Sequence, residues 1–271
     1  MKIMLLAMML FILPCVSFAS SLPLNTGYDY SNNNVYPNTI PDDYWIRIAS
    51  YTPVTPNVGP SWTIATFGGW AAAMNGPTGI PSKWINAFGN TAASATGINT
   101  GNPGYAIYRK CFCLQGQYGQ SSIQGSARSD DTIEIWLNSH LNTVLATSPG
   151  RFQSSLTPHN LNYTNQSGFK SGRNCIYVLV EDAGTVTGLD IAANIVTAGT
   201  VPIIPAKGPN MSFEPCSCGG GGPVTTVETG GVKKSSLRLA AEPDDQTVVN
   251  EIIKMAEARR LEKTRLNQPK K

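Results

Sequence analysis

Charged residues and histidine are scarce in this chain. Asp, Glu, Lys and Arg make up 14% of its 271 residues, whereas about 25% is usual for a soluble domain. The segment from Ser20 to Val227 carries nine basic and ten acidic residues. Because a surface that binds nucleic acid needs a basic excess, we expect no nucleic-acid partner for this segment.

Catalytic motifs are also absent from the sequence. It contains no G-x-S-x-G nucleophile elbow, no G-x-x-x-x-G-K-[ST] phosphate loop and no G-x-G-x-x-G that opens a helix. The two histidines, His140 and His159, stand in turn-like segments and lack the context of a catalytic base. We therefore predict that the protein is not an enzyme and uses no cofactor.

Long apolar runs are missing beyond the N-terminus, so the sequence offers no later segment of the roughly 18 residues that a membrane helix requires. At the N-terminus, Lys2 precedes an apolar run from Ile3 to Val16, and Ser17 and Ala19 are small residues suited to a cleavage site. This pattern is typical of a signal peptide. We expect residues 1–19 to be removed and the protein to be secreted, to the cell surface or outside the cell.

Removal of that segment would leave five cysteines. These disulfide candidates are Cys111, Cys113, Cys175, Cys216 and Cys218. Disulfides form in the oxidising compartments that an exported protein meets, and an odd number leaves one thiol free or paired between molecules. Cys111 and Cys113 share a face of an extended segment, so either could meet Cys175 on a neighbouring strand. Cys216 and Cys218 could pair locally; a metal site there would need more ligands, so we expect none.

Gly, Pro, Asn, Ser and Thr are abundant, which favours strands and turns over helices. Ser20 to Asn38 is polar and loop-like. Segments rich in strand-forming residues follow at 44–48, 62–67, 83–88, 105–114, 121–127, 132–137, 174–180 and 189–196. Short strands separated by turn signals, such as Asn138-Ser139, predict an all-β, antiparallel sandwich or barrel.

The character of the chain changes after Thr197. Several prolines and the glycines from Gly219 to Gly222 predict a flexible linker over residues 201–243. Asp244 or Asp245 offers a helix N-cap. Apolar residues then recur at helical spacing: Val248, Val249, Ile252, Ile253 and Ala256. We expect an amphipathic helix of about 20 residues in the charged tail, 244–271, which would need a partner surface to be well ordered.

Several segments match a known pattern. Residues 127–138 are similar to an A-x-x-D-D … v-y-l-N-G stretch, and residues 168–178 look like F-x-x-G-x-N-x-L-x-v-x-V. Residues 187–189 match a t-G-L before a last strand, and the aromatics of 43–45 and 83–85 match positions near the start of the pattern. In this order the segments resemble secreted bacterial galactose-binding-like domains.

The resemblance implies a jelly-roll β-sandwich over residues 42–200, preceded by an N-terminal extension at 20–41. It also implies an association with glycan recognition, although a fold does not fix a function. Two features depart from the pattern: Ser139 stands where the pattern has Gly, and the pair Cys111 and Cys113 is unusual in it.

Candidate binding residues come from the aromatics and from residues 127–131. Trp70 follows a glycine pair and is the first candidate for stacking on a ligand, with Arg128 and Asp130 as hydrogen-bonding candidates. The tryptophans inside predicted strands are assigned to the core: Trp45, Trp84 and Trp136. Asp130 and Asp131 point to opposite faces of a strand, so we expect them to cap backbone N–H groups rather than act as a catalytic pair. One of them could instead be a ligand of a structural Ca²⁺.

The sequence thus predicts a secreted, non-catalytic β-sandwich that binds a glycan or another surface polymer. The alternative is a structural or assembly subunit of an extracellular filament or adhesin. In that alternative the C-terminal tail is a docking element for self-association or for a protein partner, because it combines a Cys-x-Cys, a glycine hinge and a charged helix.

Overall fold

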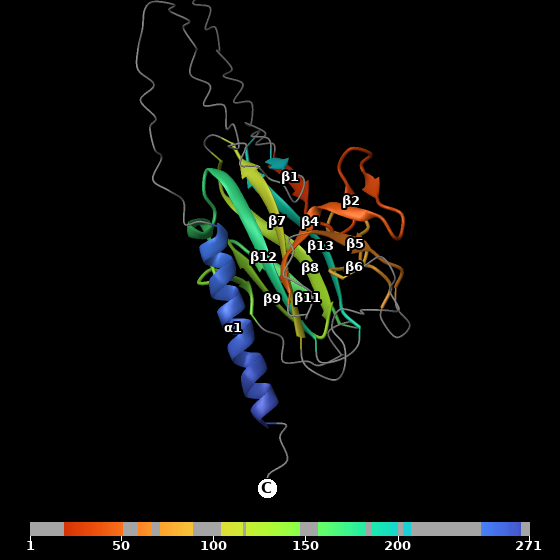
Figure 1. Cartoon of the computed structure of the whole chain (residues 1–271). Helices are drawn as coiled ribbons and strands as arrows, with labels where there is room; N and C mark the ends of the chain where they lie inside the picture. The colour runs from red at the N-terminus through yellow and green to blue at the C-terminus, as the bar shows by residue number, and fades with distance from the viewer. Residues whose placement is uncertain are drawn as a thin grey trace, which may run out of the picture.

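The computed structural model describes residues 19–50, 59–66, 71–88, 104–115, 118–146, 157–182, 186–199, 203–206 and 245–266. Its strands are β1 (Ala19–Pro23), β2 (Tyr28–Asp29), β3 (Asn34–Val35), β4 (Pro41–Ser50), β5 (Gly59–Thr63), β6 (Ile85–Asn86), β7 (Gly104–Leu114), β8 (Ser121–Asp130), β9 (Thr132–Leu137), β10 (Thr143–Leu145), β11 (His159–Tyr163), β12 (Gly172–Asp182), β13 (Gly188–Ala198) and β14 (Ile203–Pro205). A 3-10 turn spans Gln166–Gly168, and the helix α1 spans Asp245–Leu266 (Figure 1).

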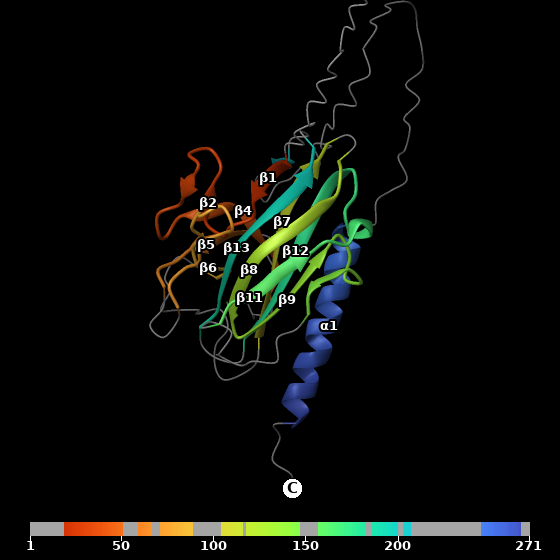
Figure 2. The ribbon, with the colours of Figure 1, turned by 180° about the vertical axis from the view of Figure 1, so that it is seen from behind.

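Antiparallel pairing joins most strands into one sheet in the order β10-β9-β12-β7-β4-β5-β6-β13-β8-β11. In addition, β1 pairs with β13 and β14 pairs with β7, whereas β2 and β3 form a separate hairpin. The sheet folds over so that β9, β12 and β7 face β8, β11 and β13, and its end strands β10 and β11 come close together (Figures 1 and 2). The predicted all-β antiparallel fold with a C-terminal helix is confirmed, and its two layers belong to one nearly closed sheet.

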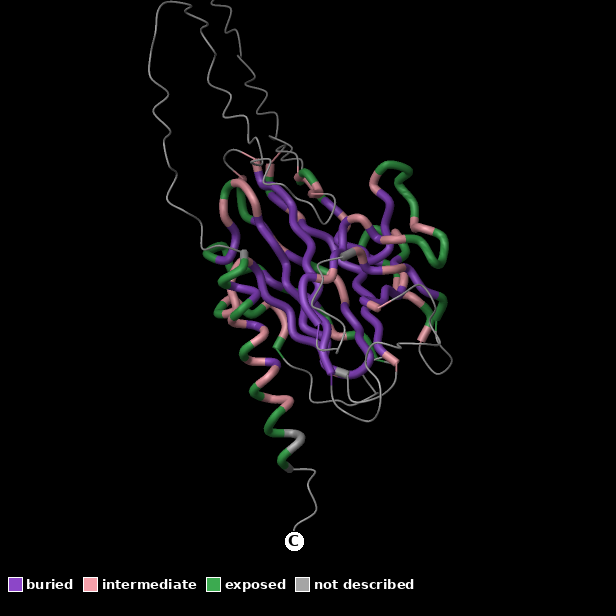
Figure 3. The backbone as a smooth tube through the Cα atoms, in the orientation of Figure 1, coloured by how far each residue is buried: buried purple, intermediate pink, exposed green. Residues whose placement is uncertain are grey.

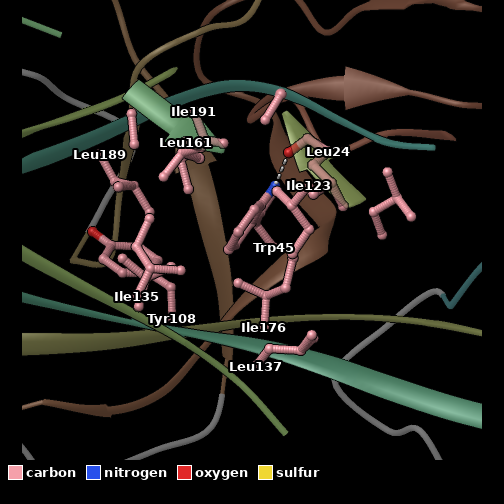
Figure 4. Packing of buried hydrophobic residues seen from close by; sticks show 14 of the residues in the cluster. Leu24, Trp45, Tyr108, Ile123, Ile135, Leu137, Leu161, Ile176, Leu189 and Ile191 are labelled. Carbon is pink, nitrogen blue, oxygen red and sulfur yellow. Dashed lines mark hydrogen bonds between the residues drawn. The ribbon is translucent and has the colours of Figure 1, made fainter. Parts of the chain in front are cut away.

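The main core lies between the two layers. Its residues alternate along the strands with residues that face outward, as expected for a sheet. Members include Leu22, Leu24, Trp45, Tyr108, Phe112, Ile123, Ile135, Leu161, Ile176, Val178, Leu189 and Ile191. The indole N–H of Trp45 donates to the carbonyl of Leu24 at 3.0 Å, which satisfies its one polar atom inside the core (Figure 4).

A second apolar cluster lies on the outer face of β4, β7, β9 and β12, under α1. The helix buries Val248, Val249, Ile252 and Ala256 there, and the tube of Figure 3 shows the helix alternating between buried and exposed positions. The predicted C-terminal helix therefore finds its partner surface on the sheet itself. Trp136, which we assigned to the core, is buried in this outer cluster rather than between the layers.

Three segments differ from the sequence-based expectation. The loop predicted over 20–38 is wrong for its start, because β1 pairs with β13 and Leu22 is buried in the core. Within the predicted linker, Ile203 pairs with Leu114 of β7. His159 begins β11 instead of lying in a loop. Each of these strands is short, and its pairing partner is remote in sequence. The local sequence pattern therefore gave little indication that a strand forms there.

Candidate binding face

The outer surface of β8 is polar and uncharged. Along this strand Ser122, Gln124 and Ser126 alternate with Ile123 and Ala127, which are buried in the core. Because successive side chains of a strand point to opposite faces, the three polar residues face away from the other layer. They form the central row of a candidate binding surface.

Neighbouring strands extend this row with amides and hydroxyls. Asn160 and Asn162 of β11 pair with Ser126 and Gln124, and Asn194 of β13 pairs with Gln124 from the other side. We call this set of residues the polar face: Ser21, Ser122, Gln124, Ser126, Asn160, Asn162 and Asn194. All seven are uncharged.

Much of the hydrogen-bonding capacity of the polar face is available to a ligand. Gln124, Asn160 and Asn162 are exposed. The amide of Gln124 donates to the hydroxyl of Ser122 at 3.2 Å, and that of Asn194 donates to the hydroxyl of Ser21 at 3.2 Å. Side-chain amides both donate and accept, so this surface suits a polyhydroxylated, uncharged ligand.

The interior cavity differs from the polar face in character. A cavity between the layers is lined by apolar side chains alone: Leu24, Trp45, Ile123, Ile135, Val144, Leu161, Ile176 and Ile191. Figure 4 labels all of these side chains except Val144 and shows the labelled ones converging from both layers. A lining without polar atoms cannot orient a polar ligand, so the chemistry of this cavity is that of the core.

Arg128, a predicted ligand contact, lies next to the polar face but is buried. Its Nη2 is 2.8 Å from Oδ2 of Asp190, which is fully buried. The same nitrogen donates to the carbonyl of Ala72, and the guanidinium stacks 5.4 Å from the ring centre of Trp84. Ser82 also donates to Asp190. Burial raises the pKa of Asp190, against the hydrogen bonds from Ser82 and Arg128, which lower it.

This ion pair anchors the segment that follows Trp70. The indole of Trp84 donates to the carbonyl of Ala71 at 3.0 Å, and the backbone N–H of Met74 donates to Asp190 at 3.2 Å. Trp70 itself lies outside the described residues. The location of Arg128 favours a role in holding this segment, and its role as a ligand contact stays a prediction.

Asp130 and Asp131 lie where the chain crosses from one layer to the other. Asp130 ends β8 and Asp131 precedes β9; both are buried. Hydrogen bonds fix the backbone around them. The hydroxyl of Thr187 donates to the carbonyl of Asp130 at 3.3 Å, and the N–H of Asp131 donates to the carbonyl of Glu181 at 3.3 Å. The predicted ligand contact by Asp130 and the predicted capping by both carboxylates stay predictions. No group of three or more potential metal ligands occurs in the described ranges.

Two asparagines of the family-like segments have a structural role. The amide of Asn138 donates to Oδ1 of Asn174 at 2.8 Å and to the carbonyl of Gly168 at 2.9 Å. Its own Oδ1 accepts from the N–H of Cys175 at 2.8 Å, and Asn174 donates to the carbonyl of Lys170 at 2.7 Å. This network fixes the turns that precede β10 and β12.

The structure pairs two of the candidate cysteines with each other. Cys111 of β7 and Cys175 of β12 form a disulfide between directly paired residues. Cys113 is disulfide-bonded as well. Cys216 and Cys218 lie outside the described residues.

A buried lysine lies in the core and was not predicted from the sequence. Lys110 is fully buried, and its Nζ lies 4.8 Å from the ring centre of Tyr30 and 5.4 Å from that of Trp45. Burial lowers the pKa of Lys110 to about 7, against the charge of Asp42, which raises it. The carboxylate of Asp42 accepts backbone hydrogen bonds from Gly27, Tyr44 and Trp45. The strand alternation around Tyr108 and Phe112 indicated this burial, because it places residue 110 on the core side of the strand.

Comparisons with known proteins add little to this picture. No family model matches the chain, and no curated protein matches it. Among solved structures, the chain is similar to a PA14 sugar-binding domain from an RTX adhesin, with 11% sequence identity and a TM-score of 0.27. The match covers 62% of this chain and 99% of that domain. In the described parts of the chain, no helix combines the length and apolar character needed to cross a membrane.

Proposed function

We propose that this protein is a secreted, non-catalytic binding module that recognises an uncharged glycan through the polar face. The observation that carries the proposal is the set of exposed amides on β8 and β11, Gln124, Asn160 and Asn162, on a surface without charged members. Glycan hydroxyls both donate and accept hydrogen bonds, as these amides do. An open strand surface suits an extended polymer better than a small molecule, which would need a concave pocket.

Trp70 is a second element of the proposal. Arg128 follows Ser126 by two residues on the same face of β8, and it binds the carbonyl of Ala72. The chain that follows Trp70 is therefore held at one end of the polar face. Trp70 lies outside the described residues, and we keep it among the proposed ligand contacts because aromatic side chains offer the stacking surface that sugar rings commonly use.

The proposal is tested by screening the purified protein against an array of neutral and charged glycans, followed by calorimetry on the strongest ligand. The test variant combines Gln124→Ala, Asn160→Ala and Asn162→Ala. We expect it to bind at least about tenfold more weakly, because removing one or two net hydrogen bonds costs about 1.4 kcal/mol or more. The matched control combines Thr143→Ala and Gln246→Ala, which are exposed on β10 and α1.

The control variant should bind like the wild type, and Trp70→Ala should weaken binding by a similar factor. Wild-type binding to no glycan on the array would refute the proposed function. Equal affinities for the wild type and the triple variant would show that the glycan binds outside the polar face.

A further inference from the structure

The exposed carboxamides of the polar face lie side by side across strands rather than along one strand. Gln124 of β8 pairs with Asn162 of β11 on one side and with Asn194 of β13 on the other (Figure 2). Gln124 and Asn162 are exposed, whereas Asn194 is buried and its amide donates to the hydroxyl of Ser21 at 3.2 Å. Ser21 is exposed on β1, which pairs with β13. Exposed hydrogen-bonding groups therefore follow a line that crosses β11, β8, β13 and β1.

Along β8 the polar face is less accessible. The outward neighbours of Gln124 on this strand are Ser122 and Ser126, which have shorter side chains and are only partly exposed. The hydroxyl of Ser122 already accepts a hydrogen bond of 3.2 Å from the amide of Gln124. The next outward residue, Arg128, is buried and paired with Asp190. A polymer that followed β8 would therefore meet one exposed amide between two short hydroxyls.

The spacing of the groups also differs between the two directions. Neighbouring strands are about 4.8 Å apart, whereas alternate residues of one strand are about 6.8 Å apart. In an extended glycan of pyranose rings joined by β-1,4 linkages, each ring advances the chain by about one strand spacing, so successive rings lie over successive strands. From β11 to β1 the line crosses three strand spacings, about 14 Å, which corresponds to about three rings.

We infer that the polar face binds a linear, uncharged, β-1,4-linked polysaccharide that crosses β11, β8, β13 and β1. This inference rests on the proposed function and specifies its ligand class. The hydroxyls of one ring bond to Asn162, those of the next ring to Gln124 and those of the third to Ser21. Each of these side chains both donates and accepts hydrogen bonds, as the sugar hydroxyls do. Internal rings make the contacts, because a strand surface does not enclose the end of a chain as a pocket does.

Calorimetry of the full chain with ladders of oligosaccharides tests the ligand class. The probes are β-1,4-linked oligomers of glucose, mannose and N-acetylglucosamine, each with one to six rings. We expect at least one ladder to gain about tenfold in affinity or more between one and three rings, because each ring adds hydrogen bonds over a further strand. Beyond three rings the gain should be less than about twofold per ring. A monosaccharide that binds as tightly as its trimer would overturn the inference.

Two double variants test the direction of the bound chain. Gln124→Ala with Asn162→Ala removes neighbouring amides across two strands and should weaken trimer binding about tenfold or more. Ser122→Ala with Ser126→Ala removes the hydroxyls on both sides of Gln124 along β8 and should weaken it less than about threefold. Circular dichroism checks that both variants are folded. Equal losses, or a larger loss for the serine variant, would show that the chain follows β8 and would overturn the inference.

Failure of the inference is separable from failure of the proposed function. Binding of a branched or differently linked glycan from the array, with no binding of any ladder, would overturn the inference and leave the proposed function standing. No binding to any glycan of the array or the ladders would refute both.

Discussion

Arg259 of α1 and Glu134 of β9 form an ion pair where the helix packs on the sheet, with Nη1–Oε2 and Nη2–Oε1 distances of 3.0 and 3.1 Å. Glu134 is largely buried, whereas the Arg259 side chain is 35% exposed. Glu181 lies 3.9 Å from the same guanidinium. Glu134 raises the pKa of Arg259, against burial, which lowers it. This contact links the C-terminal helix α1 to β9, next to one end strand of the sheet.

Replacing Arg259 by Met should lower the free energy of unfolding by about 1 kcal/mol, a modest value because the pair is partly screened by solvent. It should also speed hydrogen exchange of α1 backbone amides. The control is Arg260→Met, since Arg260 pairs with Glu257 within the helix. Equal effects of the two substitutions in urea titrations would contradict a specific role for the Glu134 contact.

The ion pair between Arg128 and Asp190 should be far more sensitive to substitution. Arg128→Met leaves the carboxylate of Asp190 buried without its cation, so we expect a loss of about 3–5 kcal/mol of stability. Replacing both residues, Arg128→Met with Asp190→Leu, should cost less than Arg128→Met alone. Thermal unfolding followed by circular dichroism measures both, and a single variant as stable as the wild type would refute the anchoring role.

Lys110 predicts a dependence of stability on pH. Its folded-state pKa of about 7 lies below the ordinary value of 10.5. Between these values the unfolded chain binds more protons, so the free energy of unfolding should rise with pH, by up to about 1.4 kcal/mol per unit. The rings of Tyr30 and Trp45 favour the ammonium and oppose this effect.

The measurement compares the wild type with Lys110→Met in denaturant titrations from pH 7 to pH 9. The wild type should gain stability relative to the variant over this window. A constant difference would show that the aromatic rings keep Lys110 charged throughout.

The disulfide between Cys111 and Cys175 should contribute strongly to stability. It closes a sequence separation of 64 residues, for which the chain-entropy argument gives about 4 kcal/mol. The variant Cys111→Ser with Cys175→Ser should therefore unfold at clearly lower denaturant concentration. Unchanged stability would mean that strain in the native disulfide offsets the stabilisation expected from the lower entropy of the unfolded chain.

Peptide mapping of the oxidised protein should show how the remaining cysteines are bonded. Cys113 is disulfide-bonded, and Ile204 of β14 pairs with it, so we expect its partner to be one of the cysteines that follow β14 in the sequence, Cys216 or Cys218. One cysteine should then remain reactive to a thiol label. A peptide joining Cys216 to Cys218 would contradict this expectation.

Glycan binding through the polar face should be nearly independent of salt. Screening weakens interactions between charges, and the polar face has none. Raising the salt concentration from about 0.05 to 0.5 M should therefore leave the affinity within about twofold. A tenfold loss would point to a charged ligand and to a different surface.

The sequence by itself determined the fold class, the long central strands and the C-terminal helix. Alternation along 105–114, the near-continuous apolar run of 174–180 and the helical spacing from Val248 to Ala256 are local patterns that burial imposes directly. It also indicated that Cys175 could pair with Cys111 or Cys113. The sequence of β8 contained the polar row as well, but Ser122, Gln124 and Ser126 gave no reason to prefer them over other polar residues.

Only the tertiary structure decided which residues from remote segments meet. It joined Asn160 and Asn162 to Gln124, placed Arg128 against Asp190, and enclosed Lys110 among aromatic rings. It also supplied short strands such as β1, whose five residues pair with β13, which is remote from β1 in the sequence. These arrangements depend on pairing between distant strands. A residue's own neighbours specify its face of the strand, and only the closed sheet specifies what lies beside it.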